Sequence, residues 1–234
     1  MIQFFRKIRQ RLLTENKFSK YLLYAIGEIV LVVIGILIAL QINNLNEEKK
    51  SQKQLDNFLV LMLDELAKDK EFFEKGLARI DTNSRFLSAI SEGHYTDVSI
   101  ELFPKIIGNS MANKNFGITY NNIKADGKFN LIANIELKKV LLAYYEEYIS
   151  KYNEWANWHQ KYVTENIEGY IMMNLPVEVG YKTDPDLLIA AFEKGEHLSI
   201  VNYQLTFLID FRPQLLKNLD LIKKLKVLIE TELS

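Results

Sequence analysis

The chain has 234 residues, a formal net charge of −1 at pH 7 and no cysteine. The lack of cysteine excludes disulfide bonds and thiol chemistry, although it permits an oxidising compartment. Residues 43–234 carry a net charge of −5, which is not the signature of a nucleic-acid-binding protein, so we expect no nucleic-acid partner. Only ten glycines and four prolines interrupt a sequence rich in helix-forming residues, which favours an all-α fold.

Residues 1–20 form a basic segment in which six Lys or Arg residues are opposed only by Glu15. Apolar residues recur among the basic ones at near-helical spacing, which predicts a short amphipathic helix lying on the inner leaflet of a membrane. The alternative interpretation is that these charges only direct the insertion of the chain. Twenty residues are in either case too few for a cytoplasmic signalling domain.

Residues 21–42 form an apolar run whose only charged side chain is Glu28. As a helix the run would measure about 33 Å, enough for the roughly 30 Å hydrocarbon layer of a bilayer. It is longer than the core of a secretory signal peptide, and no A-x-A cleavage pattern follows it. We therefore expect a retained signal anchor: one transmembrane helix in contact with the lipid bilayer.

The flanks of this run predict its orientation. An excess of Lys and Arg belongs on the cytoplasmic side, so the N-terminus is expected inside the cell. Beyond the run, residues 43–234 carry 23 basic and 28 acidic residues. Residues 43–234 would then form a mildly acidic domain in the periplasm, attached to the inner membrane of a two-membrane bacterium.

Glu28 needs its own explanation, because an ionised carboxylate near the bilayer centre is costly. Its side chain would reach back toward the cytoplasmic interface with little difficulty, since helical side chains tilt toward the N-terminus. The competing hypothesis is that Glu28, Gly35 and Ala39 share one helix face, on which Gly35 and Ala39 have the small-xxx-small spacing of transmembrane contacts. That face would bind another transmembrane helix, from a second copy or from a partner protein.

Beyond residue 44 the helix is expected to continue into a stalk that merges with an antiparallel helical bundle. Apolar residues fall at heptad spacing, with Gln52 at the one polar position. These residues are Leu45, Leu59, Leu66, Phe73 and Ile80, with Leu55 and Met62 as a second set. Other apolar residues widen the stripe, which favours packing inside a bundle over a two-stranded zipper.

Residues 91–130 are the least regular part of the sequence, because glycines and a proline separate short apolar pieces. We expect a short helix near 99–107. The dipeptide Asp126-Gly127 predicts a turn, which would close either a small β-hairpin or a connection between two helices.

A second long helix is predicted over residues 135–168, with an aromatic stripe on it. The stripe consists of Tyr144, Tyr145, Tyr148, Tyr152, Trp155, Trp158 and Tyr162. Such a stripe usually fills a bundle core. Alternatively it lines a ligand groove or a protein interface, for which the candidate residues are Tyr148, Tyr152, Trp155 and Trp158.

Two further helices are predicted near the C-terminus. Asp184 is a typical N-cap with Pro185 at the first helical position, and Gly195 is a typical stop, which predicts a helix over about 185–194. The final helix is expected over about 199–232, kinked or split by Pro213 near residues 210–212.

The anchor resembles the signature of a family of uncharacterised single-pass bacterial membrane proteins. Residues 24–44 read YAIGEIVLVVIGILIALQINN, and residues 120–132, YNNIKADGKFNLI, and 137–145, LKKVLLAYY, are also similar to that family's pattern. Leu45 departs from it, because a tryptophan is expected there. The resemblance implies a bacterial inner-membrane protein with a helical outer domain, and it implies no biochemical activity.

No motif for catalysis or for a cofactor is present. The sequence has no HExxH, no Gly-rich phosphate loop and no GxSxG elbow. Its three histidines, His94, His159 and His197, are far apart and lack a metal-ligand spacing. We therefore expect no catalytic residue, no cofactor, no metal and no enzyme activity; a site built from scattered residues is the alternative.

The sequence favours a membrane-anchored interaction or scaffold protein, which contacts a partner or a second copy through its span and its aromatic face. The alternative is a periplasmic ligand sensor that signals through a membrane partner, because the cytoplasmic segment is too short to supply an output. A membrane-bound enzyme is the third hypothesis, without a supporting motif.

Overall fold

The computed structural model describes residues 18–234. The chain divides into two compact units, residues 1–54 and residues 55–234, and we call the second unit the helical domain. The predicted all-α fold is confirmed. Within the described part of the chain the regular structure is helical, and only Glu178 and Lys182 pair in an isolated β-bridge.

Helix α2 (Phe18–Ser91) contributes residues to both units. Between Leu22 and Leu45 most of its large apolar side chains are exposed, an arrangement that is unfavourable in water. Among the described residues, α2 is the one helix long and apolar enough to cross a membrane. This finding agrees with the span predicted at residues 21–42; most of the amphipathic segment predicted at residues 1–20 lies outside the described residues.

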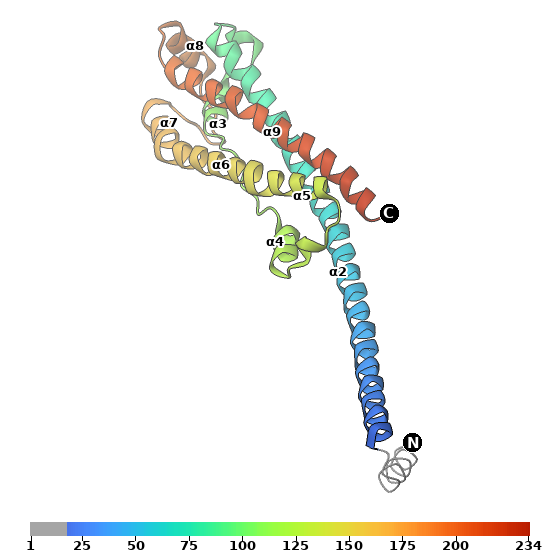
Figure 1. Ribbon diagram of the computed structural model, residues 1–234. Coiled ribbons are helices and arrows are strands. Elements are labelled where there is room, and N and C mark those ends of the chain that lie inside the picture. Colours follow the sequence, from blue (N-terminus) through green and yellow to red (C-terminus); the bar gives the residue numbers. More distant parts are fainter. Residues whose placement is uncertain (1–17) are drawn as a thin grey trace. The chain divides into compact units, whose positions relative to one another are not determined.

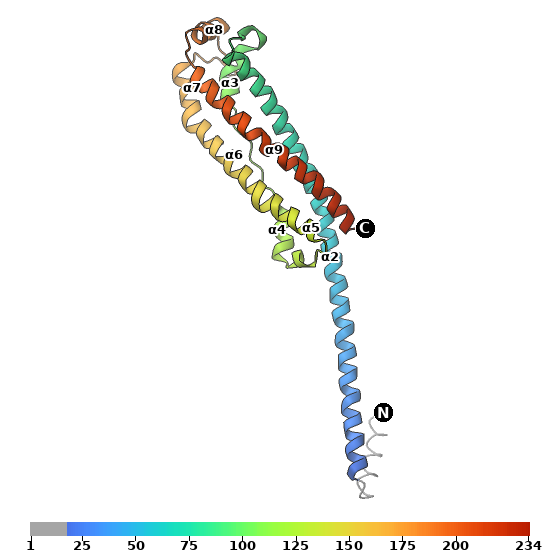
Figure 2. The ribbon, with the colours of Figure 1, turned by 45° about the horizontal axis from the view of Figure 1, so that its top comes forward.

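The helical domain adds short and long segments to the C-terminal part of α2. They are η1 (Tyr95–Asp97), η2 (Ile100–Leu102), α3 (Phe103–Ile107), α4 (Ile118–Ala125), η3 (Lys128–Leu131), α5 (Ile135–Leu142), η4 (Ala143–Ile149), α6 (Ser150–Tyr162), η5 (Val163–Ile167), α7 (Glu168–Asn174), α8 (Pro185–Glu193) and α9 (Leu198–Glu232). Segments α5 to α7 follow one another without a break over residues 135–174. The frame of the domain is thus three long helices: α2, the 135–174 run and α9 (Figures 1 and 2).

The heptad pattern predicted for α2 forms its contribution to the core. The apolar residues at these positions are almost fully buried from the start of the domain onward: Leu55, Leu59, Met62, Leu66, Phe73 and Ile80. Leu45 is 49% exposed and belongs to the first unit. The compact unit therefore starts at Leu55, the first buried core residue.

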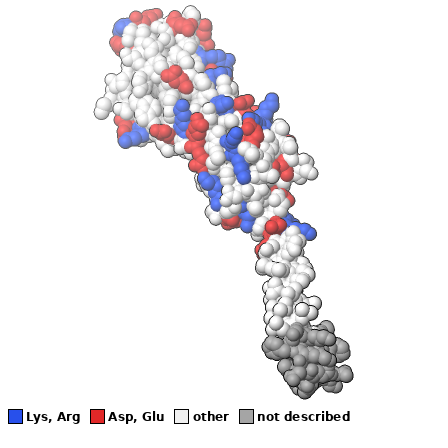
Figure 3. Space-filling model, viewed as in Figure 1, with Lys and Arg blue, Asp and Glu red and all other residues white. Residues whose placement is uncertain are grey.

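Helix α9 runs antiparallel to α2. Near the end of α2, the Ser91 hydroxyl donates to Asn202 near the start of α9 at 2.7 Å. Further along, the Arg212 guanidinium donates to the Asp81 carboxylate at 2.7 Å. These polar contacts connect the two helices. On the face shown in Figure 3, the surface of the domain mixes acidic and basic side chains.

Residues 109–117, which we call the strap, run along the seam between α2 and α6. The ring of Phe116 stacks on Phe73 of α2 with 5.4 Å between centroids and meets Tyr152 of α6 edge-on at 5.9 Å. The Tyr152 hydroxyl donates to the carbonyl of Ala112 at 2.8 Å. The strap therefore fills this seam with its own side chains.

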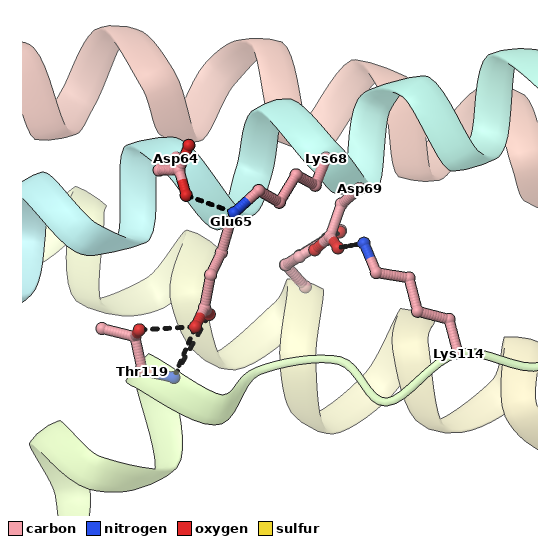
Figure 4. A network of polar contacts seen from close by, with 7 residues as sticks. Asp64, Glu65, Lys68, Asp69, Lys114 and Thr119 are labelled. Carbon is pink, nitrogen blue, oxygen red and sulfur yellow. Dashed lines mark hydrogen bonds and ion pairs between the residues drawn. The ribbon is translucent and has the colours of Figure 1, made fainter.

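Two carboxylates of α2 hold the strap and the start of α4 (Figure 4). Asp69 is 2% exposed, pairs with Lys114 and accepts a 3.0 Å hydrogen bond from the Tyr144 hydroxyl. Burial raises the pKa of Asp69, and the hydrogen bonds from Lys114 and Tyr144 oppose the rise. One turn earlier, Glu65 accepts from both the backbone N–H and the hydroxyl of Thr119, at 3.2 and 2.6 Å.

The second long helix extends further than predicted and is less regular. It ends at Asn174 instead of residue 168, and it includes two π-helical segments, η4 and η5. A π turn holds more residues than an α turn, so neighbouring residues can both face the core. Tyr144 and Tyr145 do so, at 0% and 8% exposure.

Of the kink or split predicted at Pro213, the split is wrong, because α9 is one continuous helix through that position. The kink stays a prediction. Proline removes the backbone hydrogen bond to the carbonyl four residues earlier, that of Ile209. Both Pro213 and Ile209 lie on the exposed side of α9. We infer that water satisfies the freed carbonyl there, so the core packing of α9 continues unbroken.

The short predicted elements are largely confirmed. The helix expected over 99–107 consists of the 3₁₀ turn η2 followed by α3. The Asp126-Gly127 turn connects α4 to η3, so the helix connection is the right alternative and the hairpin is wrong. Asp184 caps α8 by accepting from the backbone N–H of Asp186 at 2.9 Å.

Gly117, where the strap meets α4, permits a direct test of this packing. Its φ is +73°, and a Cβ atom there would lie 2.8 Å from Cδ1 of Tyr145. Gly117→Ala is expected to lower the free energy of unfolding by about 2–4 kcal/mol, through backbone strain plus the clash. Gly127→Ala is the control, because its φ is +69° but open space surrounds it, so only about 1 kcal/mol is lost. Equal losses in chemical unfolding would contradict the proposed close packing.

Candidate functional site

The aromatic stripe of the 135–174 run divides between the core and the surface. Tyr152 is 3% exposed and packs in the core. Tyr148 and Trp155 are half-buried, and Trp158 is 47% exposed. The core interpretation therefore holds for Tyr152. The half-buried and exposed members lie at a groove, and their role in binding stays a prediction.

The groove has a volume of about 870 Å³ and lies between α6 and α9. Its α6 side is formed by Glu154, Trp155 and Trp158. Its α9 side is formed by Ser199, Asn202, Tyr203, Thr206, Phe207 and Asp210. This volume falls in the range of roughly 300–1,000 Å³ that is usual for small-molecule sites.

Smaller hollows continue the groove at both ends. One shares Trp155 and Asp210 with the groove and extends it toward Tyr148 and Lys217. The other shares Ser199 and Tyr203 and extends toward η5 and toward Tyr170 of α7, whose hydroxyl hydrogen-bonds His197. The α6–α9 seam is thus open over much of its length.

Ring contacts hold the aromatic side chains of the groove in place. Trp158 lies 5.5 Å from Tyr162 with nearly parallel rings and 5.7 Å from Phe207. Trp155 stacks on the buried Phe211 at 5.7 Å. Side chains fixed in this way lose little conformational entropy when a ligand binds, so the groove is preorganised.

The groove rests on a buried polar chain behind Phe207. His159 stacks on Phe207 with 3.9 Å between centroids, and its Nδ1 accepts the backbone N–H of Met111 at 3.2 Å. This arrangement assigns the proton to Nε2, which donates to the side-chain oxygen of Gln204 at 3.0 Å. Gln204 in turn donates to the carbonyl of Ile107 at 2.8 Å. This series of hydrogen bonds ties α6 and α9 to the strap and to the end of α3 that precedes it.

Carboxylates are the charged groups of the central groove. Glu154 lies on the α6 side and Asp210 on the α9 side, both exposed, and no Lys or Arg is among the described residues that line it. Lys151 and Lys217 line only the smaller hollow at one end. The central groove is therefore a negative, aromatic surface, which disfavours anionic ligands.

No group of three or more His, Asp or Glu residues in the described part of the chain is placed to hold a metal ion. His159 is occupied by its hydrogen bonds to Met111 and Gln204, as given above. The expectations that the chain is not an enzyme and binds no cofactor stay predictions.

The three residues singled out in the span lie in the first unit. Glu28 is half-buried, Gly35 and Ala39 are exposed, and a Cβ atom added at Gly35 would meet nothing within 4 Å. The face is thus open at Gly35 and Ala39 in the single chain. The contact predicted there stays a prediction.

The α9 side of the groove was not found from the sequence. Tyr203, Thr206 and Asp210 follow one another at intervals of three and four residues, which places them on one helix face. This spacing can be read from the sequence, although apolar residues on every side of α9 obscure it. The packing of α9 against α6 cannot be read from the sequence.

Comparison with known proteins gives no match: no family model, no curated protein and no solved structure is similar to this chain.

The buried His159 predicts a pH-dependent stability. Burial lowers its pKa below the ordinary value of 6.5, Arg79 adds to this effect, and the bond with Gln204 opposes it. Between the lowered value and 6.5 the unfolded chain binds more protons than the native chain, so stability falls as the pH drops below about 6.5. His159→Gln should weaken this slope in unfolding experiments from pH 7.5 to 5. An identical slope in both proteins would show that His159 does not cause it.

Proposed function

We propose that the protein is a membrane-anchored interaction protein, whose helical domain binds its partner in the groove between α6 and α9. The observation that carries the proposal is the exposure of Trp158 and Tyr203, each 47% exposed, on facing sides of this groove. Large aromatic side chains favour burial and are enriched at binding sites. The strap fills the α2–α6 seam, whereas exposed aromatic rings line the α6–α9 seam. These rings are the reason for assigning the partner to this seam.

The proposed location is the inner membrane of a bacterium, with the N-terminus in the cytoplasm and the helical domain in the periplasm. The basic flank of residues 1–20, the apolar stretch of α2 and the resemblance of residues 24–44 to a bacterial anchor family support it. In this arrangement the face with Glu28, Gly35 and Ala39 would contact a second transmembrane helix.

A ligand sensor is the alternative function. The groove volume of about 870 Å³ favours it, because this size suits a small molecule. A sensor of this kind would pass its signal to a partner within the membrane, since residues 1–20 are too few to form an output domain.

The orientation can be tested without removing any native cysteine, because the chain has none. In spheroplasts, a membrane-impermeant maleimide should label a Glu48→Cys variant and leave a Gln10→Cys variant unlabelled until the cells are lysed. The charge asymmetry of the two flanks is the reason for this expectation. Labelling of the Gln10→Cys variant before lysis would reverse the proposed orientation.

The interaction can be tested by photo-crosslinking of full-length protein in native membranes. A photoreactive amino acid at Tyr203 should yield discrete crosslinked products, whereas the same group at the exposed Glu147, outside the groove, should not. In the second arm, the double variant Glu28→Leu, Gly35→Ile should lose crosslinks formed through the span.

The two arms test the two contact surfaces separately. Products that are equal at Tyr203 and Glu147 would remove the groove from the proposal. Span crosslinks that survive the double substitution would remove the transmembrane contact.

A further inference from the structure

The chemistry of the groove limits what can bind there. Two carboxylates, Glu154 on α6 and Asp210 on α9, lie on opposite sides of it, and the described residues that line it include no basic side chain. An anionic ligand would meet uncompensated negative charge. A neutral apolar ligand would leave both carboxylates without a new partner.

The rings of the groove favour the same kind of ligand as its carboxylates. Trp155, Trp158, Tyr203 and Phe207 all line it, and the electron-rich faces of such rings attract ammonium and guanidinium groups. The domain already makes contacts of this type elsewhere: the ammonium of Lys217 lies 5.8 Å from the centroid of Tyr148, and that of Lys114 lies 5.2 Å from the centroid of Phe116. The described residues that line the central groove thus supply aromatic rings and carboxylates, but they include no Lys or Arg that could occupy the site.

The remaining lining residues suit the polar part of such a ligand. Ser199, Asn202 and Thr206 follow one face of α9 beside Tyr203. Their hydroxyl and amide groups can donate to or accept from a substituent of the ligand. Asn202 and Thr206 have bonds within the domain, to the Ser91 hydroxyl and the Asn202 carbonyl, so both are held in position.

We propose that the α6–α9 groove binds a small organic cation, an ammonium compound with apolar substituents, whose charge lies between Glu154 and Asp210 and whose substituents pack on the tryptophans. This inference rests on the alternative function proposed above, the ligand sensor, because it names the kind of ligand that the groove receives. A small molecule is favoured over a basic protein segment, because Lys151 and Lys217 at one end would repel a continuing basic chain.

The chain carries its own reporter for this test, because its only two tryptophans, Trp155 and Trp158, both line the groove. Full-length protein in an uncharged maltoside detergent is titrated with choline and, separately, with 3,3-dimethyl-1-butanol, the neutral analogue in which carbon replaces the charged nitrogen. Choline is expected to change the tryptophan emission until the signal saturates. The neutral analogue at the same concentrations is expected to leave the emission unchanged.

Charge variants test the role of the carboxylates. Asp210→Asn and Glu154→Gln should each weaken choline binding about 3- to 10-fold. Glu147→Gln, an exposed acid of the same helical run outside the groove, should leave it unchanged. All three side chains are exposed, so the variants are expected to fold, and circular dichroism melting curves verify this.

The outcomes separate the inference from the proposed function. An equal response to choline and to its neutral analogue would overturn the cation site while leaving a binding groove. Tighter binding of a lysine-containing peptide than of choline would overturn the small-molecule assignment in favour of a protein segment. If no probe binds and the Tyr203 crosslinks are absent, both proposals fail; if the crosslinks are present, only the cation proposal fails.

Discussion

A cluster of aromatic rings at the centre of the helical domain sets the spacing of all its long helices. Phe73 of α2, Phe116 of the strap, Tyr152 of α6 and Phe211 of α9 meet there, with centroid distances of 5.1 Å between Phe73 and Tyr152 and 5.5 Å between Tyr152 and Phe211. Four segments that are far apart in the sequence therefore share one packing unit. Because such interiors are densely packed, a change in one ring displaces the others.

The strap makes the three-helix frame asymmetric. It occupies the α2–α6 seam through Phe116, and the buried Asp69 holds it there through Lys114. The opposite side of α6 has no such cover among the described residues, and its tryptophans meet the facing side chains of α9. The groove thus arises from the way the core is filled: the chain supplies one strap for two apolar seams.

Much of this architecture follows from sequence periodicity. The heptads of α2 identified the buried residues from Leu55 to Ile80, and the capping pattern at Asp184 located α8, because both signals are local. The groove was predicted only on its α6 side, through Trp155 and Trp158. Its α9 side depends on which helices become neighbours, and that choice is made by long-range packing. The absence of a split at Pro213 has a related reason, because the effect of a proline depends on which side of the helix faces water.

The π-helical segments η4 and η5 lie immediately before and after α6, the helix that bears both tryptophans. Such a segment corresponds to one residue more than the α-helical repeat accommodates, and one residue rotates an α-helix by about 100°. The side of α6 that faces α9 is therefore fixed by winding as well as by residue identity. In related chains, loss of one residue within η4 would turn a different stripe of α6 toward α9, and the same fold would present a groove of different chemistry.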